Sequence, residues 1–294
     1  MGMRRCGESC AGVRHAHCGL SDGTLPVATM HAGPANGGTV GPTPVCYPSR
    51  TSSVKAIIRR LRELKRRFTK APAAECYKNH FDGFRQAEIE RLYLSSVRYL
   101  HTNSIRANAY YFEFGCWSCN TLGFAWKHFR HHFDFDFVVF DSFEGLPKIS
   151  TIDETPIFAE RDMCMSLEEF HAKVGSLGID RNRLRVVKGY YNDSLTPELQ
   201  QSLLGKSIAV ALIDCDLYES TVPVLEFIRP FLQQGSILIF DDWSCYYGSD
   251  EKGERKAFHA FKARYPELTF QTLVQTSEAI AFYVSDVRTP GDGR

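Results

Sequence analysis

Residues 109–121 read AYYFEFGCWSCNT and join an apolar, β-rich run to a glycine and a polar turn. The run 109–114 predicts a strand, and Gly115 allows the backbone to turn tightly after it. Thr121 then opens TLGFAWKHFRHH, a segment long enough for a helix. These features predict the start of a βα unit, in which the helix N-terminus and the Thr121 hydroxyl offer donors for a carboxylate or phosphate.

Six further apolar runs rich in β-formers follow, at residues 136–140, 184–187, 207–213, 236–240, 268–273 and 279–284. Between the first five runs of the chain lie segments long enough for crossover helices, such as 218–234, which Gly235 closes. Strands that are apolar on both faces, with helices between them, predict an α/β fold with a doubly wound, mostly parallel, seven-stranded sheet. The last two runs have only a short connection, so we expect them to pair antiparallel at the sheet edge.

The remaining segments differ from this α/β core, which we place at residues 106–285. Residues 1–50 are rich in Gly, Pro, Ala, Thr and His and predict a disordered tail, and residues 286–294 a second flexible tail. Residues 51–105 predict an N-terminal helical segment, with a basic amphipathic helix at 54–70 and a second helix at 82–101. We expect the basic helix to pack on its own domain or on a second subunit in preference to a membrane; a lid and a contact in a homo-oligomer both stay open.

Composition limits the class of partner. A net charge of +1 over 294 residues gives no general attraction to nucleic acid, and no apolar run of about 18 residues predicts a membrane span. Ten cysteines are too dilute for a disulfide scaffold, and the N-terminus lacks the apolar stretch of a secretory signal. We therefore expect a cytoplasmic protein with mostly reduced thiols.

Carboxylates follow the predicted strands. In an open α/β sheet, ligands bind beyond the carboxyl ends of the strands. There the fourth strand delivers Asp214 and Asp216, and the fifth delivers Asp241 and Asp242. One or two such residues commonly cap a helix or face water, but four together repel unless they are protonated or bridged by a hard cation such as Mg²⁺.

Two motifs near the first strand are weak. The dinucleotide pattern G-x-G-x-x-G is not satisfied, because Trp117 and Asn120 stand at its second and third glycine positions. Cys116 and Cys119 form a Cys-x-x-Cys pair, but the helix does not begin at the first cysteine and no further zinc ligands lie near by in sequence. We expect these thiols to be incidental.

Five motifs in order carry a resemblance to a known family: E-F-G-x-W-x-x-x-T, FDSFEGLP, VVKGYYNDSL, LIDCDLYEST and GSILIFDDW. Over residues 80–285 they resemble the macrocin O-methyltransferase-like family of bacterial sugar O-methyltransferases, which depend on S-adenosylmethionine and magnesium. The resemblance implies a class I methyltransferase (Rossmann-like) sheet and a small-molecule acceptor, a sugar or glycoside hydroxyl.

The resemblance also implies roles for single residues. The methionine end of the cofactor is assigned to Glu113 and Gly115, its carboxylate to Thr121, and its ribose to Asp141. The metal is assigned to Asp214, Asp241 and Asp242, with Asp214 also as the catalytic base and Asp216 in support. Two neighbours complete the cofactor set, Trp117 and Ser142. The family usually has two glycines where this chain has Cys119 and Asn120.

Three rival functions stay open at this point. A nicotinamide-dependent oxidoreductase shares the sheet but needs the missing glycines. A metal-dependent methyltransferase of catechols shares the acids and takes a flat aromatic acceptor. A non-catalytic binding module would be expected to lack the metal acids. Beside the site, Trp243 and Tyr246 are expected either to wall the acceptor pocket or to pack in the core, and His259 is a less favoured candidate for reaching the pocket.

Overall fold

The computed structural model describes residues 73–104 and 107–288, so the expected basic helix at 54–70 lies outside the described residues. The helices of the described part are α2 (Ala73–Thr102), α3 (Asn120–Phe129), α4 (Leu167–Ser176), α5 (Tyr191–Ser194), α6 (Pro197–Leu203), α7 (Tyr218–Ile228), α8 (Cys245–Gly248) and α9 (Gly253–Arg264). Short 3₁₀ turns are η1 (Trp117–Cys119), η2 (Thr151–Asp153), η3 (Arg181–Arg183) and η4 (Arg229–Phe231). Helix α2 therefore begins before the expected residue 82.

All seven expected strands are present in one sheet: β1 (Ala107–Phe114), β2 (Asp134–Asp141), β3 (Leu184–Lys188), β4 (Ser207–Ile213), β5 (Ile237–Phe240), β6 (Leu268–Gln275) and β7 (Ile280–Val287). Their order is β3-β2-β1-β4-β5-β7-β6. The first five are parallel, and β7 runs antiparallel to both β5 and β6. The fold class and the antiparallel pair at the edge are confirmed; β7 continues two residues beyond the expected core boundary at 285.

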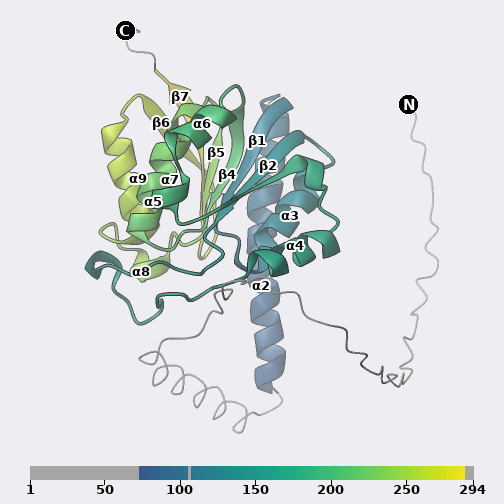
Figure 1. Cartoon of the computed structure of the whole chain (residues 1–294), viewed down its shortest axis with the longest axis vertical. Helices are drawn as coiled ribbons and strands as arrows, with labels where there is room; N and C mark the ends of the chain where they lie inside the picture. The colour runs from purple at the N-terminus through teal and green to yellow at the C-terminus, as the bar shows by residue number, and fades with distance from the viewer. Residues whose placement is uncertain (1–72, 105–106, 289–294) are drawn as a thin grey trace, which may run out of the picture. The chain divides into compact units, whose positions relative to one another are not determined.

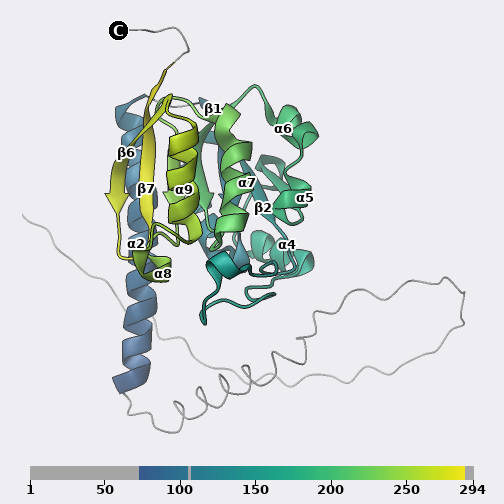
Figure 2. The same ribbon diagram turned by 90° about the vertical axis from the view of Figure 1, so that its left-hand side faces the viewer.

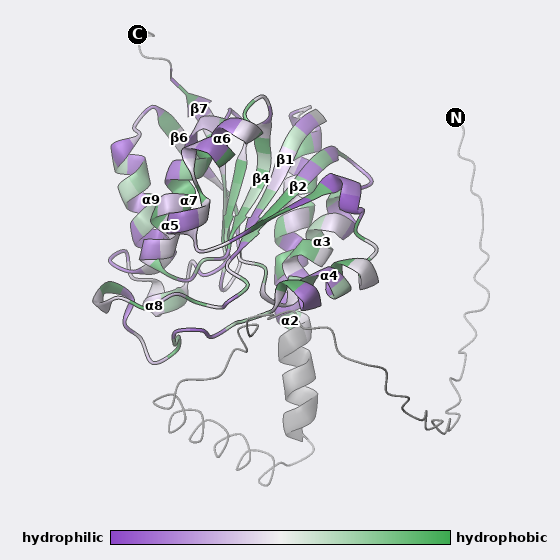
Figure 3. Cartoon of the chain, viewed as in Figure 1, coloured by the Kyte–Doolittle hydropathy of each residue, from purple (hydrophilic) through white to green (hydrophobic). Residues whose placement is uncertain are grey.

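Helices cover both faces of the sheet, as Figures 1 and 2 show from two sides. Buried side chains of α2, α3 and α4 join one core cluster, and those of α6, α7 and α9 join the other. The strands between them are coloured as largely hydrophobic in Figure 3. Because β4 and β5 are buried on both faces, they read as continuous apolar runs in the sequence.

Strand register sets the geometry of the site. Phe114 of β1 pairs with Phe140 of β2 and Ile213 of β4, and Ile213 pairs with Phe240 of β5. The residues that follow these four positions therefore stand in one row at the carboxyl edge of the sheet: Gly115, Asp141, Asp214 and Asp241.

No helix within the described ranges has the length and hydropathy of a membrane span.

Candidate active site

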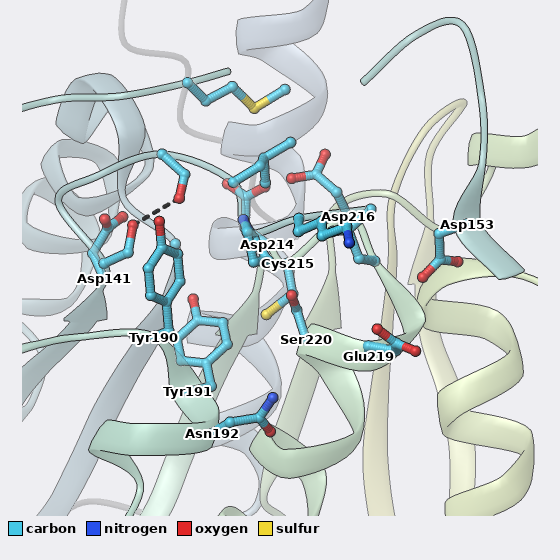
Figure 4. Close-up of a pocket in the computed structure, with 18 of the residues that line it drawn as sticks. Asp141, Asp153, Tyr190, Tyr191, Asn192, Asp214, Cys215, Asp216, Glu219 and Ser220 are labelled. Atoms are coloured by element: carbon cyan, nitrogen blue, oxygen red, sulfur yellow. Dashed lines mark hydrogen bonds between the residues drawn. The ribbon is translucent and has the colours of Figure 1, made fainter. Parts of the chain in front are cut away.

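A cavity of about 250 Å³, called here the first cavity, opens at the carboxyl ends of β1, β2 and β4. The predicted residues that line it are Gly115, Trp117, Asp141, Ser142 and Asp214. Figure 4 shows Asp141 and Tyr190 on one side of this cavity and Asp216 on the other, with Asp214 between them.

Asp141 is held in place by backbone donors. Its Oδ2 accepts a hydrogen bond from the N–H of Cys116 at 2.8 Å, and its Oδ1 accepts one from the N–H of Phe143 at 2.6 Å. Each carboxylate oxygen has two lone pairs, so acceptor capacity remains for a ligand in the cavity. The expected contact with ribose hydroxyls is compatible with this geometry.

Gly115 is required by a close approach of two strands. Its φ is +87°, and a Cβ at this position would lie 2.0 Å from the carbonyl oxygen of Asp214. Any other residue would push β1 and β4 apart where both reach the cavity. The turn that the sequence predicted is therefore present, and the backbone of β4 adds a second reason for it.

Glu113 and Thr121 have a different surrounding from the one expected. Glu113 is fully buried, accepts hydrogen bonds from Tyr111 Oη at 2.5 Å and from Thr121 Oγ1 at 2.8 Å, and does not line the first cavity. Burial is the main cause that raises its pKa to about 8, although both hydroxyls oppose the shift. The Thr121 hydroxyl is therefore committed to Glu113, which braces β1 against the start of α3. Cofactor contacts of these two residues stay a prediction.

Carboxylates gather beside the first cavity. One oxygen from each of Asp214, Asp216 and Asp242 lies within 4.8 Å of the others, and within the described ranges this is the only such group of three or more His, Cys, Asp or Glu side chains. Burial, then the charges of Asp241 and Asp242, raises the pKa of Asp214 well above its ordinary value. Burial, then Asp242, does the same for the pKa of Asp216.

The cluster fits a divalent cation. Asp242 Oδ1 accepts a hydrogen bond from the Cys245 thiol at 3.1 Å, whereas its Oδ2 is buried and has no hydrogen-bond partner among the residues that the structure describes. A buried carboxylate oxygen without a partner is costly, and oxygen ligands of this kind are those that Mg²⁺ prefers. Asp214, Asp216 and Asp242 are the described residues whose carboxylate oxygens lie close enough together to hold an ion. Asp241 forms an ion pair with Arg85 at 3.1 Å and lines the wide cavity beside Asp242, and its role as a metal ligand stays a prediction.

A second, wider cavity of about 1350 Å³ adjoins the cluster and is called here the wide cavity. It shares Trp117, Met163, Asp214 and Asp216 with the first cavity. Asp241, Asp242 and Thr121 line the wide cavity but not the first cavity. The acids therefore stand where the two cavities meet.

Two buried acids that sequence reasoning missed hold the site together. Glu254, at the start of α9, accepts hydrogen bonds from the N–H groups of Cys215 and Asp242, both at 3.1 Å. Asp153 accepts hydrogen bonds from the N–H of Tyr218 at 2.7 Å and the N–H of Gly253 at 3.0 Å. Neither residue has a local sequence signal, because its partners lie 12 to 100 positions away.

The Cys-x-x-Cys pair is buried. Cys116 and Cys119 are free thiols, and the hydrogen bond that the Cys116 thiol donates to Cys119, together with burial, raises the pKa of Cys116 well above its ordinary value. A protonated, buried thiol is a poor nucleophile, which supports the prediction of incidental thiols. Cys119 takes a left-handed φ of +55° at the position where the family usually has glycine.

The three other candidate residues, Trp243, Tyr246 and His259, have different surroundings in the structure. Trp243 packs in the core against Phe258 and Phe282, whereas Tyr246 lines the wide cavity. His259 lies 3.7 Å from Asp250 and lines neither cavity.

Comparison with known proteins identifies the family of the chain. The family model of macrocin-O-methyltransferase (TylF) matches residues 104–266. A tetracenomycin 4'-O-methyltransferase of Streptomyces olivaceus, "8-demethyl-8-(2,3-dimethoxy-alpha-L-rhamnosyl)-tetracenomycin-C 4'-O-methyltransferase", is 30% identical over 133 residues, 43% of this chain and 47% of its own. Mycinamicin III 3''-O-methyltransferase of Micromonospora griseorubida is 29% identical over 136 residues, 43% of this chain and 49% of its own.

Solved structures agree on the fold. The O-methyltransferase NovP aligns with a TM-score of 0.52 and 19% identity over 69% of this chain and 80% of its own. The calicheamicin methyltransferase CalS11 aligns with a TM-score of 0.53 and 18% identity over 85% of this chain and 100% of its own. The fold is that of the class I methyltransferases. The chain belongs to the macrocin O-methyltransferase (TylF) family, and it spans about half the length of the two curated relatives that it matches.

The raised pKa of Glu113 predicts a pH dependence of stability. Its pKa is about 8 in the folded chain and near 4.5 when exposed, so the unfolded state loses its proton first. The free energy of unfolding should therefore fall by about 1.4 kcal/mol per pH unit between these values because of this group. Glu113→Gln should remove that contribution. Urea unfolding across the window measures it, and an equal slope in both proteins would contradict the prediction.

The Glu254 bridge predicts a loss of stability. Glu254→Ala leaves the buried N–H groups of Cys215 and Asp242 without an acceptor, so unfolding should become easier by about 2–4 kcal/mol. Glu251→Ala is the matched control, since the Glu251 side chain is 84% exposed. Chemical denaturation of both variants provides the comparison; equal effects would show that the bridge contributes nothing specific.

Proposed function

We propose that the protein is an S-adenosylmethionine-dependent O-methyltransferase that methylates a sugar hydroxyl of a glycosylated natural product with the help of a magnesium ion. The observation that carries this proposal is the position of Asp214 and Asp216, which line both cavities. A methyl donor in the first cavity and a hydroxyl in the wide cavity would meet beside these carboxylates.

The first cavity suits the cofactor. Asp141 offers a fixed carboxylate for the ribose hydroxyls, and Gly115 leaves the floor of the cavity without a side chain. Ser142 and Tyr190 add polar groups to the lining. Trp117 stands at the boundary of the two cavities, 54% exposed, where it can cover a bound donor.

The wide cavity suits a glycoside with an apolar aglycone. The described residues include eight exposed large apolar side chains, and four of them line this cavity: Trp117, Ile157, Met163 and Tyr247. Exposed apolar side chains gathered in one place mark a binding surface. The curated relatives support the same class, since one name contains a rhamnosyl group on tetracenomycin and the other is mycinamicin III.

Charge argues against an anionic acceptor. Among the described residues, six acidic side chains line the wide cavity against two basic ones; the acids are Glu154, Asp214, Asp216, Asp241, Asp242 and Glu278, and the bases are Arg85 and Lys252. Even with one divalent cation bound, acids would remain in excess, which favours a neutral or cationic glycoside.

The chemistry needs a base and alignment. A bound magnesium ion would lower the pKa of the acceptor hydroxyl by Lewis acidity. Asp214, whose own pKa is raised by burial, takes the proton of that hydroxyl. The oxygen bonds to the methyl carbon as the carbon–sulfur bond breaks, and the sulfur leaves as the neutral thioether of S-adenosylhomocysteine.

The same proposal places the reaction in the cytoplasm. The thiols of Cys116, Cys119, Cys215 and Cys245 are free, as in a reducing compartment. For a homo-oligomer, we propose that α2 contacts the second subunit, because Leu94 on this helix is exposed.

Calorimetric titration of S-adenosylhomocysteine tests the cofactor assignment. The wild type should bind, and Asp141→Asn should bind about 10- to 100-fold more weakly because it loses charge-assisted hydrogen bonds. Asp134→Asn is the matched control, since Asp134 begins the same strand and its side chain is 93% exposed.

Absence of binding by the wild type would overturn the methyltransferase proposal. With binding established, mass spectrometry of glycosides and catechols incubated with S-adenosylmethionine identifies the acceptor class. Methylation of catechols alone would replace the sugar acceptor with the catechol alternative.

A further inference from the structure

Tyr247 is the most exposed of the large apolar side chains in the described ranges, with a relative exposure of 106%. It belongs to α8, in the segment that leads from the carboxyl end of β5 to α9, and it lines the wide cavity. Because nothing covers it among the described residues, the ring offers its faces to a molecule in this cavity.

An unusual backbone conformation accompanies this exposure. Tyr246 and Tyr247 both take a left-handed φ, at +55° and +60°, which bulky side chains rarely adopt. The two neighbours have opposite surroundings, since Tyr246 is 8% exposed and Tyr247 is fully exposed. Backbone strain of this kind persists only where the surrounding structure enforces it, and it gathers at ligand sites.

Tyr246 anchors the segment to a second loop. Its ring packs against Phe158 with the centroids 6.0 Å apart, in a small apolar cluster that includes Leu217. Gly253, at a φ of +56°, leaves room for this ring, since a Cβ there would lie 2.7 Å from Cε2 of Tyr246. In Figure 1, α8 lies beside the loop between β2 and α4, which carries Phe158. This anchor fixes the backbone that presents Tyr247 to the wide cavity.

The second loop repeats the same arrangement. Phe158 is buried in the anchor, whereas its neighbour Ile157 is 63% exposed and lines the wide cavity. Each loop therefore buries one apolar residue against the other loop and leaves the adjacent one exposed. Apolar side chains that are exposed together in a cavity indicate a surface that a ligand covers.

The place of the reaction decides which part of the acceptor meets these side chains. The hydroxyl that is methylated stands beside Asp214 and Asp216, where the two cavities meet, so the rest of the acceptor extends into the wide cavity. Its volume of about 1350 Å³ exceeds the roughly 300–1,000 Å³ of most small-molecule sites, which leaves room for a ring system besides a sugar. An apolar ring is the group that fits Tyr247 and Ile157.

We propose that Tyr247 is a specificity-determining residue that stacks on the aglycone ring of the acceptor, so that a glycoside with an apolar ring is preferred to one without. The inference rests on the proposed function and adds to it the residue that selects the aglycone. Ile157 contributes a further apolar contact from the second loop. Methyl transfer then follows the glycosyl transfer that attaches the sugar to its aglycone.

Methylation of two neutral probes by the purified full chain tests this inference. The probes are phenyl α-L-rhamnopyranoside and methyl α-L-rhamnopyranoside, because a rhamnosyl group occurs in the name of one relative. The wild type should favour the phenyl glycoside about tenfold in kcat/KM, measured by mass spectrometry with S-adenosylmethionine and Mg²⁺. Tyr247→Ala should bring the ratio close to one, mainly through the KM of the phenyl glycoside, and Tyr247→Phe should keep it.

The ratio of the two probes separates aglycone binding from damage to the fold, since misfolding or slower chemistry lowers both rates alike. Ile157→Ala should lower the ratio about threefold, because it removes less apolar area than the loss of a tyrosine ring. Phe84→Ala is the matched control and should leave the ratio unchanged, since Phe84 is 56% exposed and lines neither cavity.

An equal ratio in the wild type and Tyr247→Ala would overturn the inference, as would a wild type that does not favour the phenyl glycoside. Calorimetry with S-adenosylhomocysteine on the same samples separates this result from the proposed function. A wild type that binds S-adenosylhomocysteine but neither binds nor methylates the phenyl glycoside removes this inference while the cofactor assignment stands.

Discussion

Repulsion among buried carboxylates is the constraint on which the site depends. Parallel strands in register bring Asp214 and Asp241 into one row, and Asp216 and Asp242 follow within two residues. Burial is the largest cause that raises the pKa of all four acids, and their mutual charges add to the shift of Asp214 and Asp216. A fold keeps such a group only with protons, a cation or both, so the carboxylate edge is built for a positively charged partner.

Residues from several elements hold these carboxylates in place against their mutual repulsion. Glu254 holds the backbone ends of β4 and β5, and Asp153 holds the starts of α7 and α9. Arg85 supplies a positive charge from α2. Because these residues come from three separate segments, the geometry of the acids depends on the completed tertiary structure and on no single motif.

The sequence predicts the sheet well because its strands are buried on both faces and read as continuous apolar runs, as at 207–213. It also predicts which residues stand at the carboxyl edge, since strand order and register place Asp141, Asp214 and Asp241 there. It could not predict the pairing of Arg85 with Asp241, which joins positions 156 residues apart. Nor could it predict that the Thr121 hydroxyl is committed to Glu113, because only side-chain packing decides that contact.

Thermal unfolding of the wild type and of Asp242→Asn, with Mg²⁺ and with a chelator, tests the central claim most directly. A ligand that binds only the folded state raises the melting temperature as its concentration exceeds the dissociation constant. The account predicts that Mg²⁺ stabilises the wild type and that Asp242→Asn loses most of this effect. A wild type indifferent to Mg²⁺, or equal stabilisation of both proteins, would contradict the claim that these carboxylates form a cation site.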